Sequence, residues 1–242
     1  MDIPRTINEV IDRVYSQTKP VSIFVYGSRA RGDHLKDSDY EVGVLFERGK
    51  KWGRKELSQL HTLNNLNLYP FIYEDILRYS LDTPFPRAVF LRELAGSAIT
   101  VKGTGVIEGM KLSAVKVSDL LEVVTFQLAY ALGAVLSSRQ GDWVTASTEF
   151  IKSVLYGARA LIILETKKFP LLYEEMAEAS LELNIEQRFK DLIRHTVKVR
   201  SGAKIDPVQL YTNITFLNQV VLNRVKDELK RGDKVLLKGR KI

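Results

Sequence analysis

The sequence predicts an α+β protein, with a small mixed β-sheet in residues 1–105 and an antiparallel, all-α helical bundle in residues 106–242. Short β-branched and aromatic runs bounded by turn residues occur only in the first part. Long apolar patterns with helical spacing fill the second part. The predicted secondary structure changes near residues 103–116, from mixed strands and helices to long helices alone. We therefore expect two domains with their boundary there.

The first part is predicted to contain both helices and strands. Pro4 favours a helix start, and apolar residues follow it at helical spacing. Pro70 cannot donate a hydrogen bond to a neighbouring strand, which predicts an edge position or a bulge for the strand that contains it. The predicted elements are helices over residues 3–17, 54–64 and 86–94, and strands over residues 21–26, 40–46, 66–73 and 98–101.

The second part is predicted to be a bundle of long helices. Ser118, Asp142 and Asp206 stand where side chains cap helix N-termini, and Pro207 takes a first helical position. The predicted helices cover residues 118–138, 142–166, 173–183, 186–199 and 207–230.

Composition excludes several classes of site. The chain has no cysteine, which excludes disulfides, thiolate zinc sites and a cysteine nucleophile. Its three histidines have no metal-ligand spacing. Any metal must therefore be held by oxygen or histidine ligands, and zinc is not expected.

Charge and hydropathy set expectations for partners and location. The net charge is +7, but seven basic and three acidic residues gather in the tail 226–241, which is typical of a solvated terminus. We therefore do not expect nucleic acid as a partner. No run approaches the roughly 18 uninterrupted apolar residues of a membrane span, and the N-terminus lacks an apolar signal region. These features predict a soluble, cytoplasmic protein without membrane contact.

The stretch 25–41 is the strongest indication of chemistry. A predicted strand ends at Gly27, which lets the backbone approach a phosphate oxygen. Ser28 adds a hydroxyl and an amide donor at a predicted helix N-terminus, and Arg31 follows one turn later as a phosphate partner. Asp39 and Glu41 are hard oxygen ligands suited to Mg²⁺.

The pattern of the strand over residues 40–46 orients this carboxylate pair. Tyr40, Val42 and the later apolar residues alternate onto one face, so Glu41 is predicted to point to the other. If Asp39 is already extended, it projects beside Glu41. Each piece alone also fits ordinary turn chemistry or a solvated acidic pair. Their combination in one register predicts a site for a magnesium-bound nucleotide.

These residues resemble the DNA polymerase β-like nucleotidyltransferase superfamily, whose signature is Gly-Ser, a spacer, and Asp-x-Asp or Asp-x-Glu. Gly27-Ser28 and Asp39-x-Glu41 match it, and Arg31 falls where the family commonly has a phosphate-binding arginine. The glutamate variant is most similar to the kanamycin-type aminoglycoside nucleotidyltransferases and to minimal nucleotidyltransferases. Both a substrate-binding helical bundle and a HEPN-like helical domain are implied alternatives for residues 106–242.

The resemblance also shows departures. Many relatives place a third carboxylate on the strand that corresponds to residues 66–73, but none occurs here until Glu74. In the kanamycin-type enzymes a glutamate on the first bundle helix is the general base, and the matching register holds Phe126 or Gln127. Glu122, one turn earlier, is the nearest substitute; the alternative is an exposed helix residue.

The predicted function is magnesium-dependent transfer of a nucleoside monophosphate, AMP being expected, from a nucleoside triphosphate such as ATP to an acceptor hydroxyl. Asp39 and Glu41 would hold the metal, and Gly27, Ser28 and Arg31 the phosphates. One alternative is a catalytically weak nucleotide-binding or regulatory protein. Another is a component of a HEPN and minimal-nucleotidyltransferase toxin–antitoxin type, in which Arg188 and His195 fit the loosest ribonuclease spacing or form a surface pair.

The acceptor, a small molecule or a protein, is not identified by the sequence. The sequence alone does not show which apolar helix faces pack in the core and which contact a second subunit. A homodimer is therefore kept as an alternative.

Overall fold

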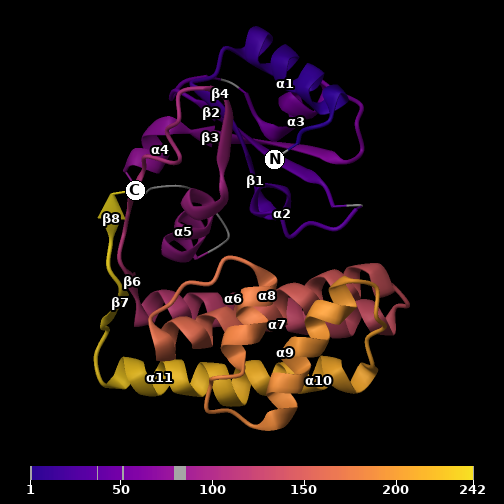
Figure 1. The fold of residues 1–242 in the computed structure, drawn as a ribbon, viewed down its shortest axis with the longest axis vertical. Coiled ribbons are helices and arrows are strands. Elements are labelled where there is room, and N and C mark those ends of the chain that lie inside the picture. The colour runs from indigo at the N-terminus through magenta and orange to yellow at the C-terminus, as the bar shows by residue number, and fades with distance from the viewer. Residues whose placement is uncertain (1, 37, 51, 79–85, 242) are drawn as a thin grey trace. The chain divides into compact units, whose positions relative to one another are not determined.

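The computed structural model describes residues 2–36, 38–50, 52–78 and 86–241, and the chain forms two compact units (Figure 1). Unit 1 comprises residues 1–113 and 239–242, and unit 2 comprises residues 114–238. The chain therefore passes from one unit to the other twice, after Ser113 and after Lys238. The return of the last residues to unit 1 has no signal in the sequence.

Unit 1 is built on a four-stranded mixed sheet in the order β3-β2-β1-β4. β1 is antiparallel to both of its neighbours, whereas β2 and β3 are parallel. The mixed sheet confirms the predicted fold class, and β3 is an edge strand as Pro70 indicated. The strands are β1 (Ser22–Tyr26), β2 (Tyr40–Phe46), β3 (Leu66–Ile72) and β4 (Ile99–Gly103).

Helices cover both faces of this sheet. α1 (Arg5–Thr18) and α3 (Arg54–Ser58) contribute to the core on one face, where the even-numbered residues of β2 are buried. α4 (Tyr73–Leu77) and α5 (Arg87–Ser97) contribute to the core on the opposite face. The alternation predicted for residues 40–46 is therefore confirmed.

On the second face, Gly43 of β2 lies in close contact with a buried aromatic ring. Gly43 lies opposite Phe24 of β1, whose side chain is fully buried. A Cβ atom at residue 43 would lie 2.1 Å from the Phe24 ring. Glycine is required here because the ring fills the space that any larger residue would need.

Unit 2 is an all-α bundle around α7 (Trp143–Thr166), which is buried along most of its length. α6, α8 and α9 pack directly against α7. A helix that is apolar on nearly all sides belongs at the centre of a bundle. The surrounding helices are α6 (Val117–Arg139), α8 (Tyr173–Ser180), α9 (Gln187–Arg200), α10 (Pro207–Thr215), the π-helical η1 (Phe216–Leu222) and α11 (Asn223–Lys230).

The predicted helix over residues 207–230 is continuous but changes its winding at η1. A Cβ at Gly157 of α7 would lie 2.3 Å from Leu217 Cδ2, so the helices approach closely there. Nearby, Asn213 Nδ2 donates a buried hydrogen bond of 2.7 Å to Ser153 Oγ. This polar contact fixes α10 against α7.

Two local expectations need correction. The helix predicted over residues 54–64 ends at Ser58. Ser118 does not cap α6, because the cap residue is Lys116, whose amide donates to Asp119 Oδ2. Ser118 instead donates its hydroxyl to Asp233 Oδ2.

Four short strands were not predicted. β5 (Lys111–Leu112) pairs with β8 (Arg240–Lys241), and β6 (Val115–Lys116) pairs with β7 (Val235–Leu237). Two or three residues are too few to show an alternating pattern.

α6 is the one helix in the described part of the chain that is long and apolar enough to cross a membrane by length and composition. The central helices of soluble proteins share these properties. Within unit 2, α6 packs against α7, α10, η1 and α11.

We expect Gly43→Ala to lower the free energy of unfolding by about 1–3 kcal/mol, because its methyl group overlaps the Phe24 ring. Urea unfolding monitored by circular dichroism checks this. Gly109→Ala is the control, since the nearest atom to its new Cβ is 3.7 Å away. Equal effects of the two substitutions would contradict the packing described for Gly43.

Candidate functional site

The turn after β1 brings the backbone of Gly27 against the side chain of Glu41. Gly27 begins the short helix α2 (Gly27–Arg31) with a positive φ of 73°, a conformation that favours glycine. A Cβ atom at this position would lie 1.8 Å from Glu41 Oε2. Glu41 pairs with Tyr26 across the β1–β2 ladder, which explains the approach. The space left by the missing side chain is occupied by a carboxylate.

Asp39 lies beside Glu41, at the start of β2. Asn67 Nδ2 donates a hydrogen bond of 3.0 Å to Asp39 Oδ2. Asn67 is also the residue of β3 that is paired with Glu41 in the parallel register. Both carboxylates therefore lie at the same end of the sheet, next to the Gly27 turn.

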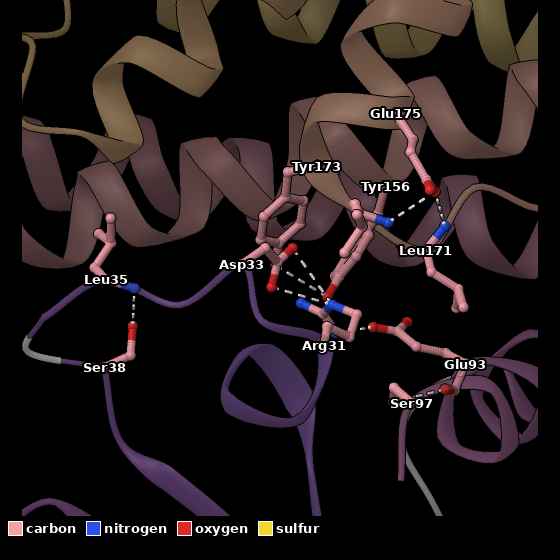
Figure 2. Close-up of polar contacts among 11 residues, drawn as sticks. Arg31, Asp33, Leu35, Ser38, Glu93, Ser97, Tyr156, Leu171, Tyr173 and Glu175 are labelled. Atoms are coloured by element: carbon pink, nitrogen blue, oxygen red, sulfur yellow. Dashed lines mark hydrogen bonds and ion pairs between the residues drawn. The ribbon is translucent and has the colours of Figure 1, made fainter. Parts of the chain in front are cut away.

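Arg29 holds the segment that leads to Asp39. Its guanidinium donates to the carbonyl oxygens of Lys36, at 2.8 Å, and Ser38, at 2.7 and 3.0 Å. The same group stacks over the Tyr40 ring, 4.6 Å from the centroid. The amide of Leu35 donates to Ser38 Oγ at 2.9 Å (Figure 2). These contacts fix the backbone on either side of the carboxylate.

Arg31 is held by two carboxylates (Figure 2). Its side chain, 3% exposed, forms ion pairs with Asp33 at 3.3 Å and with Glu93 of α5 at 2.8 Å. Glu93 in turn accepts a hydrogen bond at its carbonyl oxygen from Ser97 Oγ. Arg31 thus ties α2 to α5, and its contact with a phosphate stays a prediction.

Two tyrosines and one arginine complete the surroundings of the carboxylate pair. Burial raises the pKa of the Tyr26 phenol, and the charge of Glu41 raises it further. Burial also raises the pKa of Tyr69, while Arg54 lowers it and Glu41 and Asp39 raise it. The Arg54 guanidinium lies 4.8 Å from the centroid of the Tyr69 ring. The site therefore combines two carboxylates with neutral phenols and one cation.

The donor set at this end of the sheet fits Mg²⁺. Mg²⁺ is commonly bound through one or two carboxylates, with substrate phosphates and water as its other ligands. Asp39 and Glu41 supply that pair, and Asn67 orients one of them. In the described residues no cluster of three or more His, Cys, Asp or Glu side chains could hold a metal alone.

The remaining candidates lie elsewhere. Glu74 Oε2 accepts a hydrogen bond of 2.9 Å from the amide of Arg48, past the opposite end of β2, so it does not join Asp39 and Glu41. Glu122 is an exposed residue of α6 in unit 2. Arg188 and His195 both line a cavity of unit 2, between α9 and α10.

Sequence reasoning missed three contributors: Arg29, Arg54 and Asn67. Asn67 could have been found from strand register, because a residue of β3 level with Glu41 faces the same side of the sheet. Arg29 and Arg54 carry no such signal, since their contacts depend on the path of loops.

A comparison with known protein families finds a match within unit 1. Residues 6–83 match the model of the nucleotidyltransferase domain family. This segment contains Gly27, Ser28, Arg31, Asp39 and Glu41. No curated protein sequence matches the chain.

The fold of the whole chain is similar to that of solved structures. One is spectinomycin adenyltransferase AAD(9) from Enterococcus faecialis, solved with ATP and spectinomycin. The TM-score is 0.60 at 14% identity, and the match covers 93% of this chain and 100% of that one. The resemblance to nucleotidyltransferases with a C-terminal helical region is therefore confirmed.

We expect Glu41→Gln to lower the pKa of Tyr69 towards its ordinary value of about 10, because a negative charge that opposes phenolate formation is removed. The tyrosine ring-carbon signals in an NMR titration measure this, with Tyr69→Phe for assignment. Glu74→Gln, whose carboxylate binds the Arg48 amide, is the matched control. An unchanged Tyr69 pKa in Glu41→Gln would contradict the described arrangement.

Proposed function

We propose that this chain, whose residues 6–83 form a nucleotidyltransferase domain, transfers AMP from magnesium-bound ATP to a hydroxyl group of an acceptor. The observation that supports this most directly is the carboxylate pair of Asp39 and Glu41 set against the backbone of Gly27. Such a pair beside a glycine turn is suited to holding a metal next to a phosphate chain.

Asp39 and Glu41 would hold the metal, which when bound shields the charge on the phosphates and on the reacting oxygens. Asn67 fixes one oxygen of Asp39 and thereby sets the direction of the other. The missing side chain at Gly27 leaves room for the Glu41 carboxylate, which would hold the metal, and with it the phosphates, close to the backbone of this turn. Ser28 offers a hydroxyl and an amide to a phosphate oxygen.

The reaction needs alignment more than a covalent intermediate with the protein. The acceptor oxygen forms a bond to the α-phosphorus of ATP, the bond from that phosphorus to the bridging oxygen breaks, and pyrophosphate leaves. The acceptor hydroxyl loses its proton in the process. Arg29 contributes indirectly, because it holds the backbone that carries Asp39 in place before the substrate arrives.

The proton of the acceptor hydroxyl requires a general base. Glu122 is our candidate, since it is a carboxylate on the first long helix of unit 2. Its substitution by glutamine should lower turnover without weakening ATP binding.

For the acceptor we favour a small polyhydroxylated molecule. The support is the similarity in fold to an enzyme that was solved with ATP and spectinomycin together. Spectinomycin and related aminocyclitols are therefore the first compounds to test.

We expect Asp39→Asn and Glu41→Gln each to weaken binding of a non-hydrolysable ATP analogue in the presence of Mg²⁺ by at least roughly tenfold, because each removes a charged metal ligand. Isothermal titration calorimetry with and without Mg²⁺ measures the effect. Glu47→Gln is the matched control, since Glu47 is an exposed carboxylate just beyond the other end of β2.

Turnover is tested separately, by release of pyrophosphate in the presence of ATP, Mg²⁺ and a panel of acceptors. Asp39→Ala should abolish the release that the wild-type protein shows. Unchanged turnover in Asp39→Ala would overturn the mechanism. Binding of ATP without turnover on any acceptor would instead favour a nucleotide-binding regulatory protein.

A further inference from the structure

Unit 2 contains a cavity of about 650 Å³ between α9 and α10. This volume lies within the range of about 300–1,000 Å³ that is typical of small-molecule sites. Its lining residues are Arg188, Asp191, Leu192, Arg194, His195, Lys198, Gln209 and Thr212. The proposed nucleotidyl transfer uses none of them.

The wall formed by α9 is basic. Arg188, Asp191, His195 and Lys198 follow one another at intervals of three and four residues, so they share one helix face. Two lining cations already have acidic partners: Arg194 pairs with Asp191, and Arg188 pairs with Glu186. In the described part of the chain the Lys198 ammonium has no hydrogen-bond or ion-pair partner. The Lys198 ammonium can therefore donate all of its hydrogen bonds to an anion.

His195 adds a second group to the basic wall. One ring nitrogen, Nε2, lies 3.3 Å from the carbonyl oxygen of Lys204. If Nε2 donates this hydrogen bond, the ring orientation is set by the backbone and Nδ1 remains for other contacts. Leu192, which is 3% exposed, provides an apolar part of the lining.

The opposite wall, from α10, is polar and neutral. Gln209 Oε1 accepts a hydrogen bond of 3.0 Å from the amide of Asp206, which directs the side-chain NH₂ as a donor. Thr212 Oγ1 donates to the carbonyl oxygen of Val208 at 2.8 Å, which leaves its oxygen as an acceptor. A ligand on this wall therefore meets one donor and one acceptor.

We propose that this cavity binds a small molecule that carries both a phosphate group and hydroxyl groups. Lys198 and the imidazolium form of His195, which donates from Nδ1, bind the phosphate by charge-assisted hydrogen bonds. Gln209 and Thr212 bind the hydroxyl groups. A small molecule is favoured over a nucleic acid because the basic lining residues come from α9 alone, whereas recognition of a nucleic acid needs a continuous basic path along several phosphates.

The probes are ribose 5-phosphate, inorganic phosphate and ribose, added to the full chain at constant ionic strength. The readout is the NMR signal of the His195 ring, assigned with His195→Gln. We expect ribose 5-phosphate to shift this signal in a saturable way and to bind more tightly than inorganic phosphate, whereas ribose alone causes no shift.

Lys198→Gln should raise the dissociation constant of ribose 5-phosphate roughly tenfold, because it removes one charge-assisted contact. Lys226→Gln is the matched control: it removes the same charge from the exposed side of α11, outside the cavity. Thr212→Val should weaken ribose 5-phosphate but not inorganic phosphate. Asp39→Asn should leave the His195 response unchanged, which separates this site from the proposed catalytic one.

Three results would overturn the proposal. The first is a shift of the His195 signal no larger than sodium chloride causes. The second is an equal effect of Lys198→Gln and Lys226→Gln. The third is binding of a ten-nucleotide single-stranded RNA with no saturable response to ribose 5-phosphate, which would indicate a nucleic-acid surface.

Discussion

The proposed chemistry of unit 1 depends on one steric constraint, the contact between the backbone of Gly27 and the carboxylate of Glu41. Any Cβ at residue 27 would displace that carboxylate, and the positive φ of Gly27 opposes other residues independently. The turn after β1 therefore needs a glycine because β2 carries Glu41 at this position. Asn67 and Arg29 hold Asp39 and its backbone beside Glu41 by hydrogen bonds.

Residue patterns predict much of this arrangement and fail at identifiable places. Alternation along residues 40–46 correctly assigns Glu41 to the face opposite the first core, because a strand has a strict period of two. Pro70 lacks a backbone N–H and cannot donate to a neighbouring strand, which agrees with the edge position of β3. The ion pairs of Arg31 are not predictable in this way, because Glu93 is 62 residues distant in sequence. Contacts of that kind depend on packing between elements, which periodicity does not describe.

The two proposed sites differ in their electrostatics. Around Asp39 and Glu41, negative charge is concentrated and the neighbouring phenols stay protonated, so the site attracts a cation first. The α9 wall of the second cavity offers positive charge directly and needs no metal to bind a phosphate. A phosphorylated ligand would thus meet opposite local charges in the two units.

The double passage of the chain between units affects the order in which the molecule is made. Residues 239–242 are synthesised after all of unit 2, yet β8 pairs with β5, which belongs to unit 1. Unit 2 is synthesised completely before that pairing forms. The helical bundle lies in the sequence between the two segments of unit 1, so the bundle is synthesised before unit 1 is complete. Any segment that follows β8 in the sequence would therefore extend from unit 1, although the chain up to Lys238 belongs to the bundle.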